Sequence, residues 1–149
     1  MAMPILPRDF KEFLKLLNSR RVKYLLVGGY AVAFHGYPRA TVGIDLWVEI
    51  SPDNAEKITA ALRDFGFDTP ELSASLFLEE NRVVRMGNPP FRIEVITTAS
   101  GVDFTTCYAH RTEAVIDKIP VGIIALEDLK TNKKASGRYK DLNDLQNLP

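Results

Sequence analysis

The sequence predicts an α/β (α+β) domain in which helices flank a mixed β-sheet. Short strand-like runs alternate along the chain with amphipathic helical runs, and several strand pairs are adjacent in sequence. The chain has 149 residues, 46% hydrophobic and 26% charged, which is typical of a globular protein and excludes disordered, collagen-like and coiled-coil classes. No repeat, low-complexity tract or long linker divides it, so we expect a single domain over residues 1–149.

The chain begins with a predicted helix, a strand and a shorter helix. Asp9 is expected to cap the first helix, with Glu12 completing a capping box. Apolar residues then recur at helical spacing, at Phe10, Phe13, Leu14 and Leu17. The strand, over 23–27, ends at a glycine pair, and the short helix is expected over 30–34.

The next strand, over 41–50, has two different faces. One is aliphatic, with Val42, Ile44, Leu46, Val48 and Ile50; the other carries Gly43, Asp45, Trp47 and Glu49. Such a strand is covered on its aliphatic side and free for chemistry on the other. Trp47 shares the carboxylate face, where it either stacks on a base or packs at the rim of a site.

The remaining elements follow from caps, periodicity and turn residues. Ser51-Pro52 is expected to open a helix that Gly66 ends. We further expect short helices over 72–78 and 103–110, strands over 82–86, 91–97 and 121–125, and two last helices over 126–136 and 141–148.

Charge and cysteine content exclude several classes of protein. Nineteen basic and nineteen acidic residues balance, which argues against a whole-molecule electrostatic hold on nucleic acid or membrane and leaves a local patch open. A single cysteine, Cys107, excludes an internal disulfide and a four-cysteine zinc site. The apolar stretch 24–34 is too short to span a bilayer, and the first eight residues lack a secretory signal. We therefore expect a cytoplasmic protein with no membrane partner.

A glycine pair and two acidic strands are the candidate chemical groups. Gly28-Gly29 is either a tight turn or a phosphate cradle at a helix start, and Gly43-Ile44-Asp45 follows it after thirteen residues. This spacing resembles the nucleotidyltransferase superfamily, in which a glycine pair precedes an acid-hydrophobic-acid strand. Three stretches, 27–41, 92–97 and 126–144, look like the small standalone nucleotidyltransferases of toxin–antitoxin and abortive-infection systems.

The resemblance implies a nucleotidyltransferase fold and a chemistry. Relatives transfer a nucleoside monophosphate from an NTP, with Mg²⁺, to the 3′ end of a tRNA or to a hydroxyl of a partner protein, the cognate toxin or antitoxin, and release pyrophosphate. The implied roles are phosphate binding for Gly28 and Gly29, metal binding and catalysis for Asp45 and Glu94, and triphosphate binding for Arg39 and Lys133. Lys133 is implied as a catalytic residue as well. Acids two residues apart on one strand face lie about 7 Å apart, close enough for their oxygens to share metal ions.

The sequence departs from this pattern at Gly43, which stands at the position of the first acid. Glycine offers no metal ligand. Either the chain is catalytically impaired, which we expect, or Glu49 or a water partly substitutes. On this reasoning, an aspartate at position 43 should return transfer activity. The rival hypothesis is a non-catalytic module that binds a nucleotide or docks to a toxin, an antitoxin or RNA.

A run of basic residues precedes the C-terminus. Lys130, Lys133, Lys134, Arg138 and Lys140 fall within eleven residues, and the first three share one helix face. They are either a seat for triphosphate or RNA phosphates, or a solvated helix face. Asp141 and Asp144 fit the closing motif of the family and serve equally well as solvated or capping groups.

Overall fold

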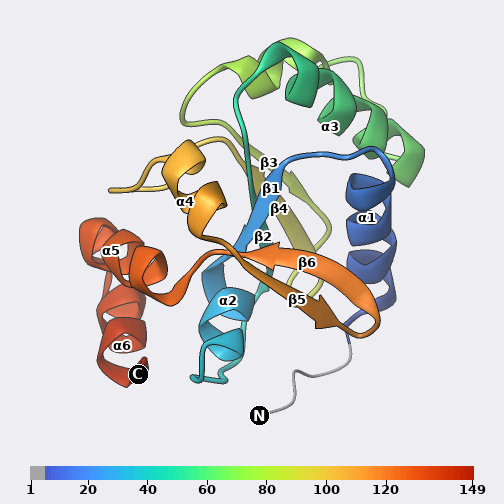
Figure 1. Ribbon diagram of the computed structural model, residues 1–149. Helices are drawn as coiled ribbons and strands as arrows, with labels where there is room; N and C mark the ends of the chain where they lie inside the picture. The colour runs from blue at the N-terminus through green and yellow to red at the C-terminus, as the bar shows by residue number, and fades with distance from the viewer. Residues whose placement is uncertain (1–5) are drawn as a thin grey trace.

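A six-stranded mixed sheet with helices on both faces organises the chain, as the computed structural model describes it for residues 6–149 (Figure 1). Residues 1–5, which belong to the segment considered for a secretory signal, lie outside the described residues. The helices are α1 (Arg8–Ser19), α2 (Gly28–Phe34), α3 (Pro52–Phe65), α4 (Phe104–His110), α5 (Leu126–Ser136) and α6 (Tyr139–Asn147), with one 3₁₀ turn, η1 (Ala74–Leu78). The strands are β1 (Tyr24–Val27), β2 (Gly43–Val48), β3 (Val83–Met86), β4 (Arg92–Ile96), β5 (Thr112–Ile116) and β6 (Ile119–Ile123). The predicted fold class is confirmed.

The strand order β3-β4-β2-β1-β6-β5 puts the two acidic strands next to each other. β2 runs parallel to β4, and in their register Asp45 lies opposite Glu94. β2 also pairs with β1, antiparallel, so that Val27, the last residue before the glycine pair, lies opposite Asp45. The topology therefore brings three separate sequence segments together at one place on the sheet.

Helices cover the two faces of the sheet unequally. Figure 1 shows α1 and α3 on one side and α4, α5 and α6 on the other, with α2 following β1. The rings of Trp47 and Phe104 meet edge to face with centroids 5.2 Å apart. Because Phe104 belongs to α4, the face of β2 that carries Asp45 and Trp47 lies on the side of α4. The aliphatic face of β2 therefore lies under α1 and α3.

The core explains why the amphipathic runs fold as predicted. The apolar stripe of α1 is fully buried, and Phe13 packs edge to face on Phe65 of α3 with centroids 5.2 Å apart. Ile58 and Leu62 complete the buried stripe of α3. Burying such side chains contributes about 1.5–3 kcal/mol each, which fixes these helices against the sheet.

Helix ends follow the predicted signals in most places. The Ser51 side chain accepts a hydrogen bond from the backbone N–H of Asn54, as an N-cap should, and α3 ends at Gly66 with φ 103°. At α1 the prediction is wrong: the helix begins at Arg8, no side chain caps it, and Asp9 lies inside its first turn. Glu12 pairs with Arg8 instead, at 3.2 Å, so the expected capping box does not form.

One strand was not predicted, and one helix starts early. β5 pairs antiparallel with β6 at the edge of the sheet through a turn at Asp117 and Lys118, both with positive φ. The last helix begins at Tyr139, two residues before the expected start, because Asp141 accepts a hydrogen bond from the backbone N–H of Arg138 and so takes the capping role considered for it.

Candidate functional site

Asp45 and Glu94 lie side by side on the face of the sheet that carries the site. They occupy paired positions of β2 and β4, and both line one pocket. Burial raises the pKa of Asp45 to about 6, and the nearby Glu94 carboxylate adds to the rise through repulsion and a shared hydrogen bond, while Lys140 and Lys133 oppose it. The pair therefore holds a proton on Asp45 more tightly than an exposed aspartate would.

The glycine pair lies directly beside Asp45. Gly28 has φ 67°, and a Cβ at this position would overlap the Asp45 carboxylate. A Cβ on Gly29 would come within 2.7 Å of the Thr41 hydroxyl and 3.1 Å of the Arg39 guanidinium. Glycine is thus required at both positions because the chain's own polar side chains approach the backbone closely.

Gly43 is buried against the neighbouring strand. A Cβ built on it would overlap the carbonyl oxygen of Arg92 and lie 2.9 Å from the Arg92 Cα. β2 and β4 have therefore closed over the space that a side chain at position 43 would need. An aspartate here could act as a metal ligand only if β4 moved first, and the expectation that it returns transfer activity stays a prediction.

The pocket has a volume of about 980 Å³ and a basic lining. Its walls come from the glycine pair, the strands β2, β3 and β4, and the helices α5 and α6. Six basic side chains line it, Arg39, Arg85, Arg92, Lys133, Arg138 and Lys140, against three acidic ones, Asp45, Glu94 and Asp144. A pocket with this excess of positive charge favours an anionic ligand.

Two arginines that sequence reasoning missed contact Glu94. Arg85 Nε donates to Glu94 Oε1 at 3.0 Å, and Arg92 Nη1 lies 3.6 Å from the same oxygen. Arg92 could have been found, because it precedes Glu94 by two residues and so shares its strand face. Arg85 could not, since its position opposite Glu94 depends on the β3–β4 register.

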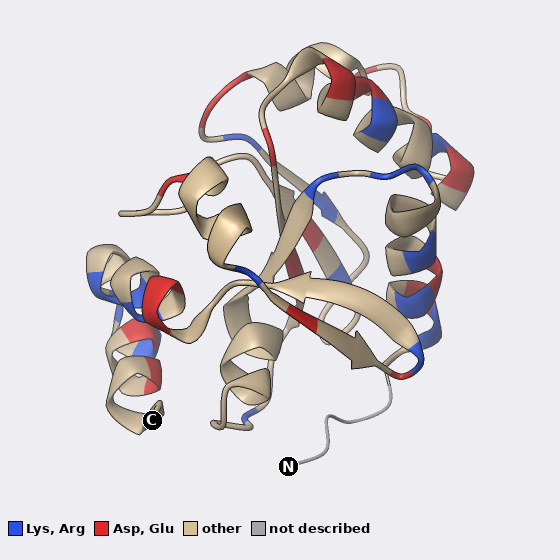
Figure 2. Cartoon of the chain, in the orientation of Figure 1, with Lys and Arg blue, Asp and Glu red and all other residues tan. Residues whose placement is uncertain are grey.

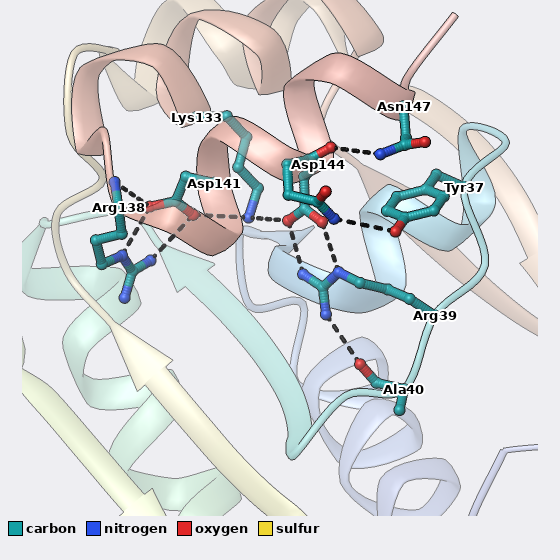
Figure 3. A network of polar contacts seen from close by, with 9 residues as sticks. Tyr37, Arg39, Ala40, Lys133, Arg138, Asp141, Asp144 and Asn147 are labelled. Atoms are coloured by element: carbon teal, nitrogen blue, oxygen red, sulfur yellow. Dashed lines mark hydrogen bonds and ion pairs between the residues drawn. The ribbon is translucent and has the colours of Figure 1, made fainter.

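A buried ionic network forms the wall made by α5 and α6 (Figure 3). Lys133 Nζ lies 3.2 Å from Asp141 Oδ1 and 3.1 Å from Asp144 Oδ2. Arg39 donates two hydrogen bonds to the Asp144 carboxylate, from Nε at 2.6 Å and from Nη2 at 2.7 Å. Arg138 Nε donates to Asp141 Oδ2 at 2.7 Å. Acidic and basic segments accordingly lie next to each other on these two helices in Figure 2.

The network explains how three charged groups stay buried. Lys133 is 4% exposed, and Asp141 and Asp144 are 0% exposed. Burial opposes ionisation of both carboxyls, but hydrogen bonds from Arg138 and Lys133 to Asp141, and from Arg39 and Lys133 to Asp144, outweigh it and lower both pKa values. Of the three roles considered for these aspartates, part of the closing motif, solvated group or capping group, the structure excludes the solvated one, and Asp141 does cap α6 through the Arg138 N–H.

Arg39 and Lys133 reach the pocket but already hold carboxylates. Both line it, yet Lys133 contacts two aspartates and Arg39 makes a two-pronged ion pair with one of them. Neither cation is free for a ligand in this arrangement. Their part in triphosphate binding stays a prediction. Lys140, which also lines the pocket, makes no ion pair within residues 6–149.

Two other candidates lie away from the pocket. Trp47 is 2% exposed, packs against Phe104, and donates its indole N–H to the Thr97 carbonyl at 3.3 Å, so it is a core residue and not a base platform. Glu49, the residue that follows β2, accepts a hydrogen bond from the Ser51 hydroxyl, and its carboxylate lies 3.7 Å from Lys23 Nζ. It does not reach the pocket and does not replace the missing acid.

The donor set fits one Mg²⁺ ion and does not fit two. Within the described part of the chain, no three His, Cys, Asp or Glu side chains are grouped to hold a metal. Asp45 and Glu94 offer adjacent carboxylates, which suit a single hard cation that keeps several waters. A second ion would need a bridging ligand, and the closed space at Gly43 cannot supply one.

Comparison with known proteins gives matches in structure only. No protein-family profile matches the chain, and no curated protein matches it. A provisionally assigned nucleotidyltransferase from Thermotoga maritima is similar in structure with a TM-score of 0.65, over 97% of this chain and 94% of that chain, at 15% identity. An antigenic nucleotidyltransferase-like protein from Paracoccidioides brasiliensis is similar with a TM-score of 0.55, over 93% of this chain and 73% of that chain, at 19% identity.

These likenesses extend over nearly the whole chain, and they show the fold. The protein has the nucleotidyltransferase fold, with its mixed sheet flanked by helices. Among the helices of residues 6–149, none combines the length and the apolar character needed to cross a membrane.

Proposed function

We propose that this protein binds a nucleoside triphosphate and is an impaired nucleotidyltransferase of the toxin–antitoxin type. The observation that carries the proposal is the meeting of Asp45 and Glu94 beside Gly28, in a basic pocket of about 980 Å³. A triphosphate carries three to four negative charges, so the excess of basic groups suits it. The fold and the stretches that resemble toxin–antitoxin nucleotidyltransferases support the same function.

The reaction we propose is transfer of a nucleoside monophosphate to a hydroxyl. The acceptor hydroxyl releases its proton to solvent as its oxygen attacks the α-phosphorus, the bond from that phosphorus to the bridging oxygen breaks, and pyrophosphate leaves. A single Mg²⁺ held by Asp45 and Glu94 would supply charge neutralisation at the phosphates. Gly28 and Gly29 approach the phosphates, and Arg39 and Lys133 keep the pocket wall in place. The acceptor is the 3′ end of a tRNA or a hydroxyl of the cognate toxin or antitoxin.

Transfer should be weak, because one acid is missing and its space is closed. The protein is incubated with each of four labelled NTPs, Mg²⁺, and either total tRNA or a cell lysate. Weak label transfer that disappears in Asp45→Ala supports the proposal. Transfer that persists in Asp45→Ala would show that the reaction is not carried by this site.

The second candidate function is a non-catalytic nucleotide-binding module. The overlap of a Cβ built at position 43 with the Arg92 carbonyl oxygen favours it, because the strand pairing leaves no room there for a metal-binding side chain. Isothermal titration with the four NTPs separates the candidates. Nucleotide binding without any label transfer supports the module, and no nucleotide binding at all contradicts both functions.

A further inference from the structure

The wall of the pocket formed by β3 and β4 carries two arginines beside a single carboxylate. Arg85 and Arg92 flank Glu94 and contact the same oxygen, Oε1. The two guanidinium groups carry two positive charges, and the Glu94 carboxylate that they contact carries one negative charge. A net positive charge therefore remains on this wall, next to the place where the donor set for a second ion is incomplete.

Both arginines keep hydrogen-bonding capacity to spare. Arg85 donates to Glu94 through Nε alone, and the Arg92 contact, at 3.6 Å, is an ion pair without a hydrogen bond. Each guanidinium has five N–H donors, so most stay unused within residues 6–149. Their side chains are 62% and 32% exposed and line the pocket, so a ligand there can reach them.

Lys140 supplies a third available cation from the opposite wall. It lines the pocket from α6, lies close enough to lower the pKa of Asp45, and is exposed. This contrasts with Arg39 and Lys133, which α6 carboxylates already hold. The available positive charge thus comes from Arg85 and Arg92, which the sequence pattern did not indicate, and from Lys140 of the basic run near the C-terminus.

We propose that Arg85 and Arg92, with Lys140, bind the phosphates of the nucleotide directly, so that the pocket takes a polyphosphate ligand without a divalent cation. The inference rests on the proposed nucleotide binding, and it makes basic side chains, in place of a divalent cation, the groups that attract the phosphates. Guanidinium groups bind phosphate oxygens with paired, charge-assisted hydrogen bonds. They can therefore supply the attraction that metal ions supply in a two-ion site.

The test is isothermal titration with ATP and with inorganic triphosphate, in excess EDTA and in Mg²⁺. The wild-type protein should bind both ligands in EDTA, within about threefold of its affinity in Mg²⁺. In the double variant Arg85→Gln/Arg92→Gln, affinity in EDTA should fall at least tenfold. Arg82→Gln is the matched control, because Arg82 is an exposed arginine next to β3 that pairs with Glu79 outside this pocket, and it should bind as the wild type does.

The outcomes separate this inference from the function on which it rests. Binding that needs Mg²⁺ overturns the inference and leaves the proposed function standing, whereas absence of binding under both conditions overturns both. Unchanged affinity in the double variant also overturns the inference. If the glutamine variant does not fold by circular dichroism, Arg85→Lys/Arg92→Lys replaces it. That variant keeps the charge but loses the paired geometry, so its affinity in EDTA should fall severalfold, and wild-type affinity would count against the inference.

Discussion

At Asp45, the candidate site lowers the stability of the folded protein. Its pKa is raised from 3.8 to about 6 by burial and by Glu94, so the folded state resists an ionisation that the unfolded chain accepts. The stability of the folded state therefore falls as pH rises from about 4 to about 6, and the loss is complete above that. A buried carboxylate that is retained at such a cost is typical of a functional site.

Replacing Asp45 by asparagine should stabilise the protein at neutral pH. Asparagine keeps the shape and can donate to Glu94 without carrying a charge. We expect the free energy of unfolding to rise by about 1–3 kcal/mol at pH 7.5 and to be unchanged near pH 3.5, where the carboxyl is protonated in both states. Urea unfolding at the two pH values measures this. A gain of equal size at both would show that the effect does not come from ionisation.

Gly43 should resist any side chain. Gly43→Ala places a Cβ against the Arg92 carbonyl, and overpacking of this kind costs about 1–3 kcal/mol. The control is Gly122→Ala in β6, where the new Cβ would lie 3.2 Å from the flexible Arg111 side chain and at an ordinary contact distance, 3.7 Å, from the Tyr24 carbonyl oxygen. We expect chemical denaturation to separate the two variants by at least about 1 kcal/mol. Equal stabilities would mean that β4 shifts at little cost to make room for a side chain at position 43. The steric obstacle to a metal-binding aspartate in Gly43→Asp would then be absent.

At the scale of elements, α5 and α6 hold together through charge more than through apolar contact. Leu129 and Lys133 are the buried residues of α5, and Asp141 and Asp144 are those of α6. A buried ionic cluster of this kind adds little net stability when complete but is strongly destabilising when one partner is removed. Because the cluster also holds Arg39, it fixes the segment before β2 against the C-terminal helix.

Removing the shared cation tests this element. Lys133→Met leaves two buried aspartates with fewer partners, so we expect a loss of about 3 kcal/mol at pH 7. Both aspartates have lowered pKa values, so their contribution is present above about pH 4 and lost as pH falls through the folded values. The difference between the variant and the wild type should accordingly shrink in acid. Lys134→Met, the exposed neighbour, is the control and should change stability by less than about 0.5 kcal/mol.

The elements also show where sequence reasoning succeeds and fails. The cap at Ser51 was predictable because the side chain and its partner N–H lie within three residues of each other. β5 was missed because it is a half-exposed edge strand joined to β6 by Asp117 and Lys118, which lack the usual Asn-Gly turn signal.

Residue patterns alone could not predict the contacts between distant segments. Arg39 and Asp144 are 105 positions apart, and only the fold places them together. The juxtaposition of Asp45 with Glu94 was expected from the family resemblance, whereas the arginines around Glu94 and the closed space at Gly43 depend on strand register. Sequence patterns thus located the site, but the charge available within it required the structure.

Over the whole molecule, the net charge is zero, but the charges are unevenly distributed. The chain has equal numbers of acidic and basic residues, yet basic side chains outnumber acidic ones two to one around the pocket. Composition alone argued against an electrostatic hold on nucleic acid. It does not argue against a focused field in one concave site, because field lines concentrate where low-dielectric walls surround like charges.

The charge asymmetry predicts a salt dependence that net charge would not. ATP affinity in EDTA should weaken about tenfold or more as NaCl rises from about 0.05 M to about 0.5 M, because shorter Debye lengths screen the basic lining. Adenosine, which lacks phosphates, is the matched ligand, and its weaker binding should not change with salt. Isothermal titration at three salt concentrations measures both slopes. If ATP and adenosine showed the same dependence, the lining would not act as a phosphate-attracting surface, and the affinity would have to come from contacts to the base and sugar.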